Sequence, residues 1–560
     1  MLNYKRYKRN PVLNFPERTW PDKQIEKAPI WCSVDLRDGN QALIEPMNVD
    51  EKMEMFDLLL RLGFKEIEIG FPAASQIEYD FLRKLVAENK IPDDVKVQVL
   101  TQCRQELVDR TFEAIQGIKN VVVHIYNSTS TLQRDVVFNK SQDEIIDIAI
   151  AGTRMVKEHL TDFDGNVQLE YSPESFTGTE VDFALRICTA VQKEWDHATD
   201  APIIFNLPAT VEMNTPNVYA DQIEWMSTHF EDRDNIILSV HPHNDRGTGV
   251  AITELALLAG ADRVEGTLLG NGERTGNVDI LTVAYNMFSQ GINPELEIED
   301  VKEIVEIYER CCKMHVDMRH PYAGKLVFTA FSGSHQDAIN KGVHAMQERG
   351  NEYWEVPYLP IDPADIGRKY EPVVRINSQS GKGGVAFVMD TVYGYKLPKK
   401  MQREFADVIQ HISEQEGGEV EPQKMMEAFK KEYFENKMPF ELVFVDIDDN
   451  MANDETHVSL DFKYNGKAIH SEADGNGPID AVKLAVKQCV PQVDFSVLDY
   501  SEHSLGKGSG AKAAAYIEMR DNRSGNITFG VGVSSNITRA SIRGMFSAMN
   551  RLAKKAKDYV

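Results

Sequence analysis

Residues 236–247 read IILSVHPHNDRG, an apolar run that leads directly into two histidines separated by one residue. In a β-strand, residues i and i+2 point to the same face, so the imidazoles of His241 and His243 can reach one point in space. A His-x-His pair at a strand end is therefore a ready-made pair of metal ligands. An isolated pair of this kind is more often two surface histidines, so the rest of the chain must decide between the two interpretations.

The run before His241 is one of eight short apolar segments that alternate with longer amphipathic segments. The eight runs are residues 30–36, 66–71, 95–100, 121–126, 167–171, 202–206, 236–240 and 263–269. Helical patterns between them include residues 52–62, 81–88, 106–115 and 144–159. Ser141 and Glu144 form a capping box at the start of the last helix. Eight regular βα units predict an α/β fold with a (β/α)8 TIM barrel rather than an open doubly wound sheet, with its chemistry at the C-terminal strand ends.

Four segments are expected along the chain. Residues 1–29 are punctuated by prolines and predict an extended arm, and residues 30–320 form the barrel with a final helix at about 300–320. Residues 321–435 are expected to be a mixed helical linker with little core of its own, because prolines and glycines interrupt it. Residues 436–560 repeat a βββα pattern twice and predict an α+β domain, either a small-molecule sensor or a dimerisation module.

Composition restricts the class of protein. A chain of 560 residues with a formal net charge of −26 does not suit a nucleic acid or an anionic membrane as partner, although a small anionic substrate remains compatible. The six cysteines are scattered without CxxC spacing, which indicates free thiols in a reducing cytosol. No apolar run approaches a membrane span, so a cytoplasmic location is expected.

Polar residues end the first and last strands of the expected barrel. Arg37 and Asp38 follow strand 1, where a guanidinium beside a carboxylate suits an oxyanion stabiliser next to a metal ligand, or alternatively a salt-bridged strand terminus. Asn277 ends the glycine-rich stretch after strand 8. Barrel closure makes strands 7, 8 and 1 neighbours, so Asp38, Asn277 and the two histidines are expected to converge on one divalent cation. Asp245 is expected to support His243 from behind.

Three motifs taken together resemble the signatures of the metal-dependent Claisen-condensing barrel family. They are DLRDGNQ at residues 35–41, HPHND at 241–245 and GERTGN at 272–277. EYSPESF at residues 170–176, residues 329–340 and the duplicated C-terminal region are similar to the 2-isopropylmalate synthases of the longer bacterial type. The resemblance implies an acyltransferase that condenses acetyl-CoA with 3-methyl-2-oxobutanoate and hydrolyses the thioester to give 2-isopropylmalate and CoA. It also implies a role in leucine biosynthesis, a homodimer, and feedback inhibition by leucine.

The resemblance assigns roles residue by residue. Asp38, His241 and His243 would bind the metal, with Asn277 completing or flanking the set. The metal is expected to be Mg²⁺, with Mn²⁺ or Zn²⁺ as alternatives, and monovalent K⁺ is a further cofactor that the resemblance allows. The substrate-binding residues are expected to be Arg37 on the developing alkoxide, Thr210 on the carboxylate, and Leu100, His124 and Ser172 around the side-chain pocket.

Two expected functions are less closely defined. Glu174 and His335 are both candidates for the general base, and His335 with Tyr370 would reach over the barrel of a second copy. The resemblance also places leucine at a helix start in the C-terminal domain, where free N–H groups suit a carboxylate. The expected leucine residues are Gly475, Gly477, Pro478, Ile479 and Ala481. The alternative for this stretch is a structural turn in a dimerisation domain.

Three rival functions remain open at this level. A sibling synthase would use pyruvate or 2-oxoglutarate, and apolar Leu100 disfavours the second acid. A lyase would run the reverse cleavage, which the long linker and duplicated domain disfavour. A leucine-binding regulator would have an inert barrel, which the intact set of Arg37, Asp38, His241 and His243 disfavours.

Overall fold

The computed structural model describes residues 4–6, 8, 10–330, 333–350, 352–370, 381–416, 420–450, 455–506 and 510–555. The chain divides into two compact units. The first comprises Met1–Phe328 and Ile361–Lys369, and the second comprises Thr329–Pro360 and Tyr370–Val560. In the part of the chain described above, no helix is both long and apolar enough to cross a membrane.

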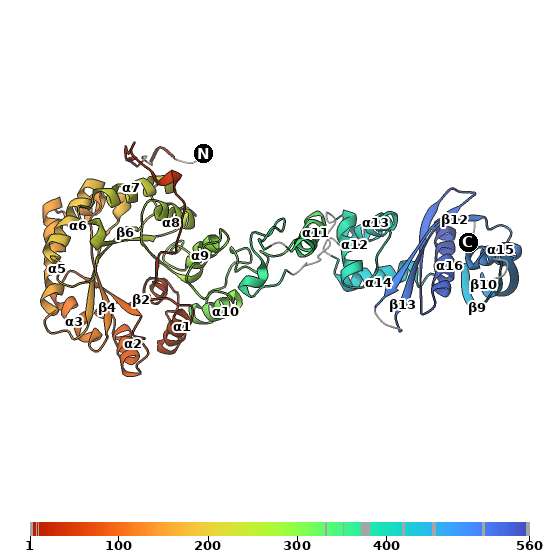
Figure 1. Ribbon diagram of the computed structural model, residues 1–560, viewed down its shortest axis with the longest axis horizontal. Helices are drawn as coiled ribbons and strands as arrows, with labels where there is room; N and C mark the ends of the chain where they lie inside the picture. The colour runs from red at the N-terminus through yellow and green to blue at the C-terminus, as the bar shows by residue number, and fades with distance from the viewer. Residues whose placement is uncertain are drawn as a thin grey trace. The chain divides into compact units, whose positions relative to one another are not determined.

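The first unit is a closed barrel of eight parallel strands, as the alternating pattern predicts (Figure 1). The strands are β1 (Ile30–Ser33), β2 (Glu66–Gly70), β3 (Lys96–Gln102), β4 (Asn120–Ser128), β5 (Asn166–Glu174), β6 (Ile203–Ala209), β7 (Ile236–Pro242) and β8 (Arg263–Gly266). The longer helices around them are α1 (Val49–Arg61), α2 (Gln76–Ala87), α3 (Gln105–Ile115), α5 (Gln142–His159), α6 (Val181–Trp195), α7 (Pro216–His229), α8 (Gly249–Leu258), α9 (Ile280–Phe288) and α10 (Val301–Cys312). Pairing of β1 with β8 closes the barrel.

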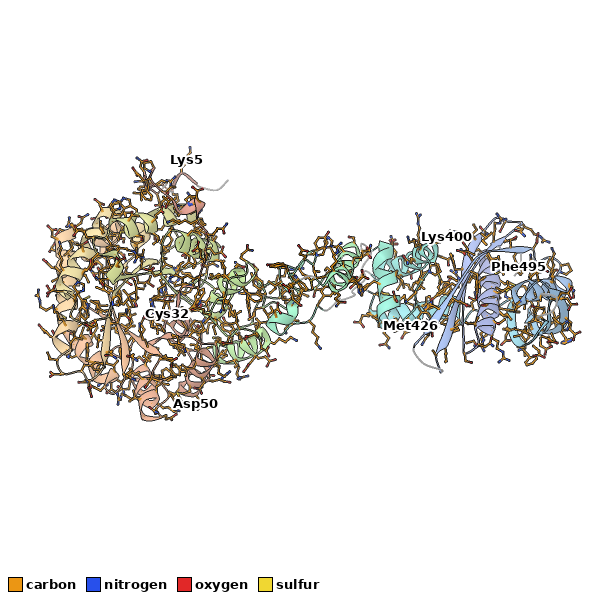
Figure 2. All side chains as sticks on the ribbon, viewed as in Figure 1. Lys5, Cys32, Asp50, Lys400, Met426 and Phe495 are labelled. Carbon is orange, nitrogen blue, oxygen red and sulfur yellow. The ribbon has the colours of Figure 1, made fainter. Side chains whose placement is uncertain are left out.

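Alternation along the strands separates a polar interior from an apolar outer layer. On β2, Glu66 points inward to Arg263 of β8, whereas the following residue, Ile67, is buried on the opposite face. Cys32 of β1 lies at the inner layer, where its thiol faces Gln98, and Figure 2 labels it among the strands. Asp50, labelled in the same view, is exposed on the outer helix α1. The barrel interior around Arg263 is therefore polar.

Three element ends differ from the sequence-based expectation. β1 stops at Ser33, and Asp35–Gly39 forms a π-helical turn closed by the bond from Gly39 N to Val34 O. β8 stops at Gly266, and the expected strand up to residue 269 is replaced by a short 3-10 turn, Leu268–Gly270, in which Leu269 is left-handed. Helix α10 ends at Cys312, where Lys313 is also left-handed, instead of continuing to residue 320. An apolar run alone does not reveal such backbone reversals.

The arm before the barrel is held against helix α7. Trp20 is buried and donates its indole N–H to Asp221 Oδ1 at 2.8 Å. The backbone N–H of Thr19 donates to Glu224 Oε2 at 2.8 Å. The arm carries the short 3-10 helix η2 (Trp20–Asp22) and is otherwise without a regular element between residues 10 and 29, which agrees with its proline content.

The second unit contains the two βββα repeats that the sequence predicts (Figure 1). The first repeat is β9 (Phe440–Asn450), β10 (Glu455–Tyr464), β11 (Lys467–Gly475) and α15 (Pro478–Cys489), and the second is β12 (Phe495–Leu505), β13 (Lys512–Asp521), β14 (Ile527–Ser534) and α16 (Ile537–Lys555). Each repeat forms its own antiparallel sheet, in the orders β11-β10-β9 and β12-β13-β14. Phe462 of the first repeat packs edge-on to Phe546 of the second, so the two repeats share one hydrophobic core.

The helices before the repeats have more core than their sequence suggests. They are α11 (Gly333–Arg349), α12 (Gly381–Thr391), α13 (Lys399–Glu416) and α14 (Pro422–Tyr433). Phe405 and Phe429 are buried in a cluster that includes Tyr516 and Phe529 from the β12-β13-β14 sheet. Along β13, Ala515 and Ile517 face the other side, so this sheet is covered on both faces. The expectation of a linker with little core is therefore wrong for α12–α14, whose partner surface lies a hundred residues further on.

Close packing of β14 on α16 depends on glycine. A Cβ at Gly532 would overlap the carbonyl oxygen of Ala540 and the backbone nitrogen of Gly544. We expect Gly532→Ala to destabilise the second unit by about 1–3 kcal/mol, because the strand or helix must shift to admit one methyl group. Differential scanning calorimetry of the full chain measures this change. Gly510→Ala is the matched control, since a Cβ there meets nothing within 4 Å, and an equal loss in both variants would contradict the packing argument.

Candidate metal centre and active site

Three ligand-type side chains meet at the C-terminal rim of the barrel. Ligand atoms of Asp38, His241 and His243 all lie within 4.8 Å of one another, and all three residues are buried. Asp38 Oδ2 is 3.2 Å from His241 Nε2 and 3.7 Å from His243 Nε2. Asp38 comes from the turn after β1, and the histidines come from the end of β7 and the residue after it. The structure thus brings together the three residues that strand spacing and barrel closure predicted to converge.

Asn277 joins this group from the loop after β8. Its Nδ2 donates to Asp38 Oδ2 at 2.8 Å, and its backbone pairs with His243. A Cβ at Gly272 would overlap Asn277 Oδ1, so only glycine leaves room for that amide. Asn277 Oδ1 and His243 Nδ1 are buried without a hydrogen-bond partner. Buried polar atoms normally have partners, so the unpartnered Asn277 carbonyl oxygen, beside the Asp38 carboxylate and the Nε2 atoms of the two histidines, gives a mixed N/O donor set that fits a divalent cation.

Arg37 is held beside the ligands by two carboxylates. Its Nε donates to Glu68 Oε2 at 2.5 Å, and its Nη1 lies 3.1 Å from Asp38 Oδ1. Burial lowers the pKa of Arg37, but the negative charges of Glu68 and Asp38 raise it by a larger amount, so the net shift is upward. Burial alone would raise the pKa of Asp38, but Arg37 and the two imidazoles bring it well below its usual range. The rim therefore combines an ionised carboxylate with a fixed cation.

The two imidazoles have opposite electrostatic environments. Burial lowers the pKa of His241, but hydrogen bonds to Asp38 and Glu265 raise it to about 9. The Glu265 contact is the shorter, at 2.7 Å from Oε2 to Nδ1. Burial and the neighbouring His241 together lower the pKa of His243 to about 4. Asp245, expected behind His243, instead forms an ion pair with Arg274 at 2.6 Å, because the loop after β8 brings that guanidinium over it.

The predicted substrate-binding residues form two groups in the barrel. His124 Nε2 lies 2.7 Å from Ser172 Oγ, and Leu100 is buried on the neighbouring strand β3. Thr210 accepts a hydrogen bond from the backbone N–H of Ser175, next to Glu174. The Glu174 carboxylate accepts from Ser128 Oγ. The sequence-based roles of these residues stay predictions.

The remaining predicted residues belong to the second unit. His335 is exposed and its ring stacks on Tyr358, with centroids 4.1 Å apart. Tyr370 Oη is buried without a hydrogen-bond partner. The expected leucine residues lie where β11 ends and α15 begins, with Pro478 in the first turn and Ala481 fully buried. Part of the 329–340 match, residues 331–332, lies outside the described residues.

Sequence reasoning missed the charged layer beneath the rim. Glu68, Arg263 and Glu265 are fully buried, and each lies on a barrel strand. The signal was present in the strands EIEIG and RVEG, where charged residues alternate with aliphatic ones. In a closed barrel that alternation places the charges inside, so their side chains must find partners there.

Comparison with known proteins identifies the family. A curated 2-isopropylmalate synthase from Clostridium acetobutylicum is 54% identical over 557 residues, which cover 98% of this chain and 99% of the relative. The chain belongs to the 2-isopropylmalate synthase family. Another member, from Acetoanaerobium sticklandii, is 51% identical and covers 100% of this chain and 98% of its own. A third, from Agrobacterium fabrum, is 53% identical, with 99% of each chain covered.

Family models match three successive regions of this 2-isopropylmalate synthase family member. Residues 28–307 match an HMGL-like model, and residues 325–390 match a model described as alpha-isopropylmalate synthase, post-catalytic domain-like. Residues 419–553 match a model described as the LeuA allosteric (dimerisation) domain. Among solved structures, a hydroxymethylglutaryl-CoA lyase from Pseudomonas aeruginosa is 19% identical, with a TM-score of 0.42, and covers 52% of this chain and 93% of its own.

Metal binding at the cluster of Asp38, His241 and His243 can be tested without an activity assay. Because a ligand that binds only the folded state stabilises it, a divalent metal at 100 times its Kd should stabilise the chain by about 2.7 kcal/mol. Mg²⁺ or Mn²⁺ titration followed by thermal unfolding measures this effect. We expect Asp38→Asn to abolish the stabilisation and Asp50→Asn, an exposed change of the same charge, to keep it. Equal stabilisation of Asp38→Asn and the unchanged chain would place the metal elsewhere.

Proposed function

We propose that this chain is a 2-isopropylmalate synthase: it condenses acetyl-CoA with 3-methyl-2-oxobutanoate and hydrolyses the thioester to release 2-isopropylmalate and CoA. One observation carries the proposal. A chain that is 54% identical to a curated 2-isopropylmalate synthase keeps Asp38, His241, His243 and Asn277 together at the active rim of its barrel, beside Arg37. The inert regulator loses support, because nothing in a pure leucine sensor requires this donor set.

The rim residues suit the carbonyl end of a 2-oxo acid. A divalent cation held by Asp38, His241, His243 and Asn277 would act as a Lewis acid on the substrate carbonyl. Arg37 is oriented by Glu68 and Asp38, and its side chain keeps 13% exposure toward the rim. A fixed guanidinium there stabilises negative charge that develops on the carbonyl oxygen during carbon–carbon bond formation. We propose Mg²⁺ as the physiological metal, with Mn²⁺ or Zn²⁺ as alternatives and K⁺ as an additional activator.

The second group of residues suits the rest of the substrate. Thr210 would bind the carboxylate of the oxo acid, and Leu100, His124 and Ser172 would surround its isopropyl group. Leu100 presents no charge, which supports a branched aliphatic side chain over the second carboxylate of 2-oxoglutarate. The proton of the acetyl methyl group must leave to a positioned base. Glu174, on the rim next to Thr210, is one candidate for this base. His335 is the other, and it would act together with Tyr370 over the barrel of a second copy.

The second unit would carry regulation. We propose that it binds leucine at residues 475–481 and dimerises the chain, which agrees with the description of the family model over residues 419–553. The N-terminus of α15 offers free backbone N–H groups to the carboxylate of an amino acid. Acetyl-CoA, the oxo acid and leucine are then the small-molecule partners of a homodimer.

The substrate is tested by CoA release from acetyl-CoA with a panel of 2-oxo acids. We expect the highest kcat/KM with 3-methyl-2-oxobutanoate and loss of activity with a chelator, restored by Mg²⁺ or Mn²⁺. A clear preference for pyruvate or 2-oxoglutarate would move the chain to a sibling reaction. Absence of CoA release with every acid, in protein that retains metal, would contradict the proposal.

Leucine regulation is tested by a small change at the proposed loop. A Cβ at Gly475 would approach Ala481 N at 2.5 Å, so Gly475→Ala must displace the start of α15. We expect this variant to keep its CoA release while its half-inhibitory leucine concentration rises at least about tenfold, which corresponds to 1.4 kcal/mol of lost binding. Gly510→Ala serves as the control because its added methyl meets no neighbour. Unchanged leucine inhibition in Gly475→Ala would remove this loop from the regulatory site.

A further inference from the structure

Glu265 is the most completely hydrogen-bonded carboxylate beneath the metal centre. Its Oε2 accepts from His241 Nδ1 at 2.7 Å and from Asn206 Nδ2 at 3.0 Å. Its Oε1 accepts from Arg263 Nη1 at 2.8 Å and from Gln98 Nε2 at 2.8 Å. The side chain has no exposed surface. Four donors occupy the four principal acceptor positions of an ionised carboxylate.

This arrangement fixes the orientation of one metal ligand. Arg263, Gln98 and Asn206 approach Glu265 through N–H groups, so the carboxylate is an acceptor and His241 must donate to it from Nδ1. The opposite ring nitrogen, Nε2, is the atom that faces Asp38 and Asn277, at 3.2 and 3.0 Å. A metal binds only the neutral imidazole, and when the proton of the neutral ring is on Nδ1 its lone pair is on Nε2. The ring is therefore both aimed and held in the tautomer that a metal requires.

The other ligand histidine has no comparable support. His243 Nδ1 is buried without a hydrogen-bond partner, and the nearby Asp245 is engaged by Arg274. The two members of the HPH pair are thus unequal, although the sequence presents them as equivalent. Of the two rings, His241 is the one whose Nδ1 is bonded to a buried carboxylate, Glu265.

A second cation is not needed at this level of the barrel. His124, Glu170 and Glu265 have the spacing of a metal site. However, the guanidinium of Arg263 already lies between the two carboxylates, with Nη1 2.8 Å from Glu265 and Nη2 3.5 Å from Glu170. Its Nε lies 2.6 Å from Glu66. The guanidinium of Arg263 therefore already supplies a positive charge to these carboxylates.

We propose that Glu265 is a positioning residue for the metal centre: anchored by Arg263, Gln98 and Asn206, it orients His241 and fixes its metal-binding tautomer. The proposal rests on the proposed metal-binding role of His241. Outer carboxylates of this kind commonly change metal affinity 10–100-fold when they are replaced. Glu265 does not touch the substrate rim, so it acts only through His241.

The test compares metal affinity in two variants that each remove one buried charge from the same guanidinium. In Glu265→Gln, the amide can donate to Nδ1 and so favour the tautomer whose Nε2 carries the proton. In the matched control, Glu66→Gln, Arg263 loses a partner of equal burial that touches no metal ligand. Binding of Mn²⁺ to the full-length protein is measured by electron paramagnetic resonance of the free ion. We expect about 10–100-fold weaker binding in Glu265→Gln and a Kd within about threefold of the unchanged protein in Glu66→Gln.

A conservative variant keeps the test decisive if Glu265→Gln does not fold. Glu265→Asp retains the charge beside Arg263 but is one methylene too short to reach both Arg263 and His241, so its Mn²⁺ affinity should also fall. Unchanged Mn²⁺ affinity in a folded Glu265 variant would overturn the proposal. An equal loss in the Glu265 and Glu66 variants would also overturn it, because buried charge in general would then be responsible. If the unchanged protein binds no Mn²⁺, Mg²⁺ or Zn²⁺, the metal-dependent function fails together with the positioning role.

Discussion

The buried ion pair between Arg263 and Glu265 is the interaction on which the catalytic half of the molecule depends. The Arg263 side chain has no exposed surface, and its partners come from five strands: Glu66 of β2, Gln98 of β3, Glu170 of β5, Ser239 of β7 and Glu265 of β8. Burying such charges is costly unless every one is paired and hydrogen-bonded. Removing one partner from a pair like this typically costs about 3–5 kcal/mol, because the other charge remains buried. The barrel is thus closed around a charge network instead of an aliphatic core.

This network connects the scaffold to the chemistry. Glu265 of this network contacts His241 directly, and Glu68, which accepts a hydrogen bond from Gln98 Nε2, contacts Arg37. The rim therefore sits on a layer whose side chains have little freedom, which is how a site at strand ends can be held in place. The second unit is organised differently, by an apolar core shared between two repeats and by helices packed on the far side of one sheet.

Two features could be predicted from the sequence alone, the barrel fold and the cluster of metal ligands. Eight apolar runs gave the barrel, and the positions of Asp38, His241, His243 and Asn277 gave the convergence of ligands. It did not predict the π-helical turn that carries Asp38, because the apolar run continues to Leu36 and gives no sign that the strand ends at Ser33. It overlooked Glu265 because a buried carboxylate looks the same in sequence as an exposed one until its partners, up to 167 residues away, are known. The core of α12–α14 was missed for the same reason, since its other half lies on β13 and β14.

X-ray absorption spectroscopy of the full-length protein loaded with one equivalent of Zn²⁺ is the most direct test of the central claim, that this barrel presents an oriented His-Asp-His-Asn metal centre. The account predicts two imidazole ligands with metal–nitrogen distances of about 2.0–2.1 Å and otherwise oxygen ligands. It also predicts that one imidazole contribution disappears in His241→Gln. A spectrum with only oxygen ligands, or with sulfur from the cysteines, would contradict it.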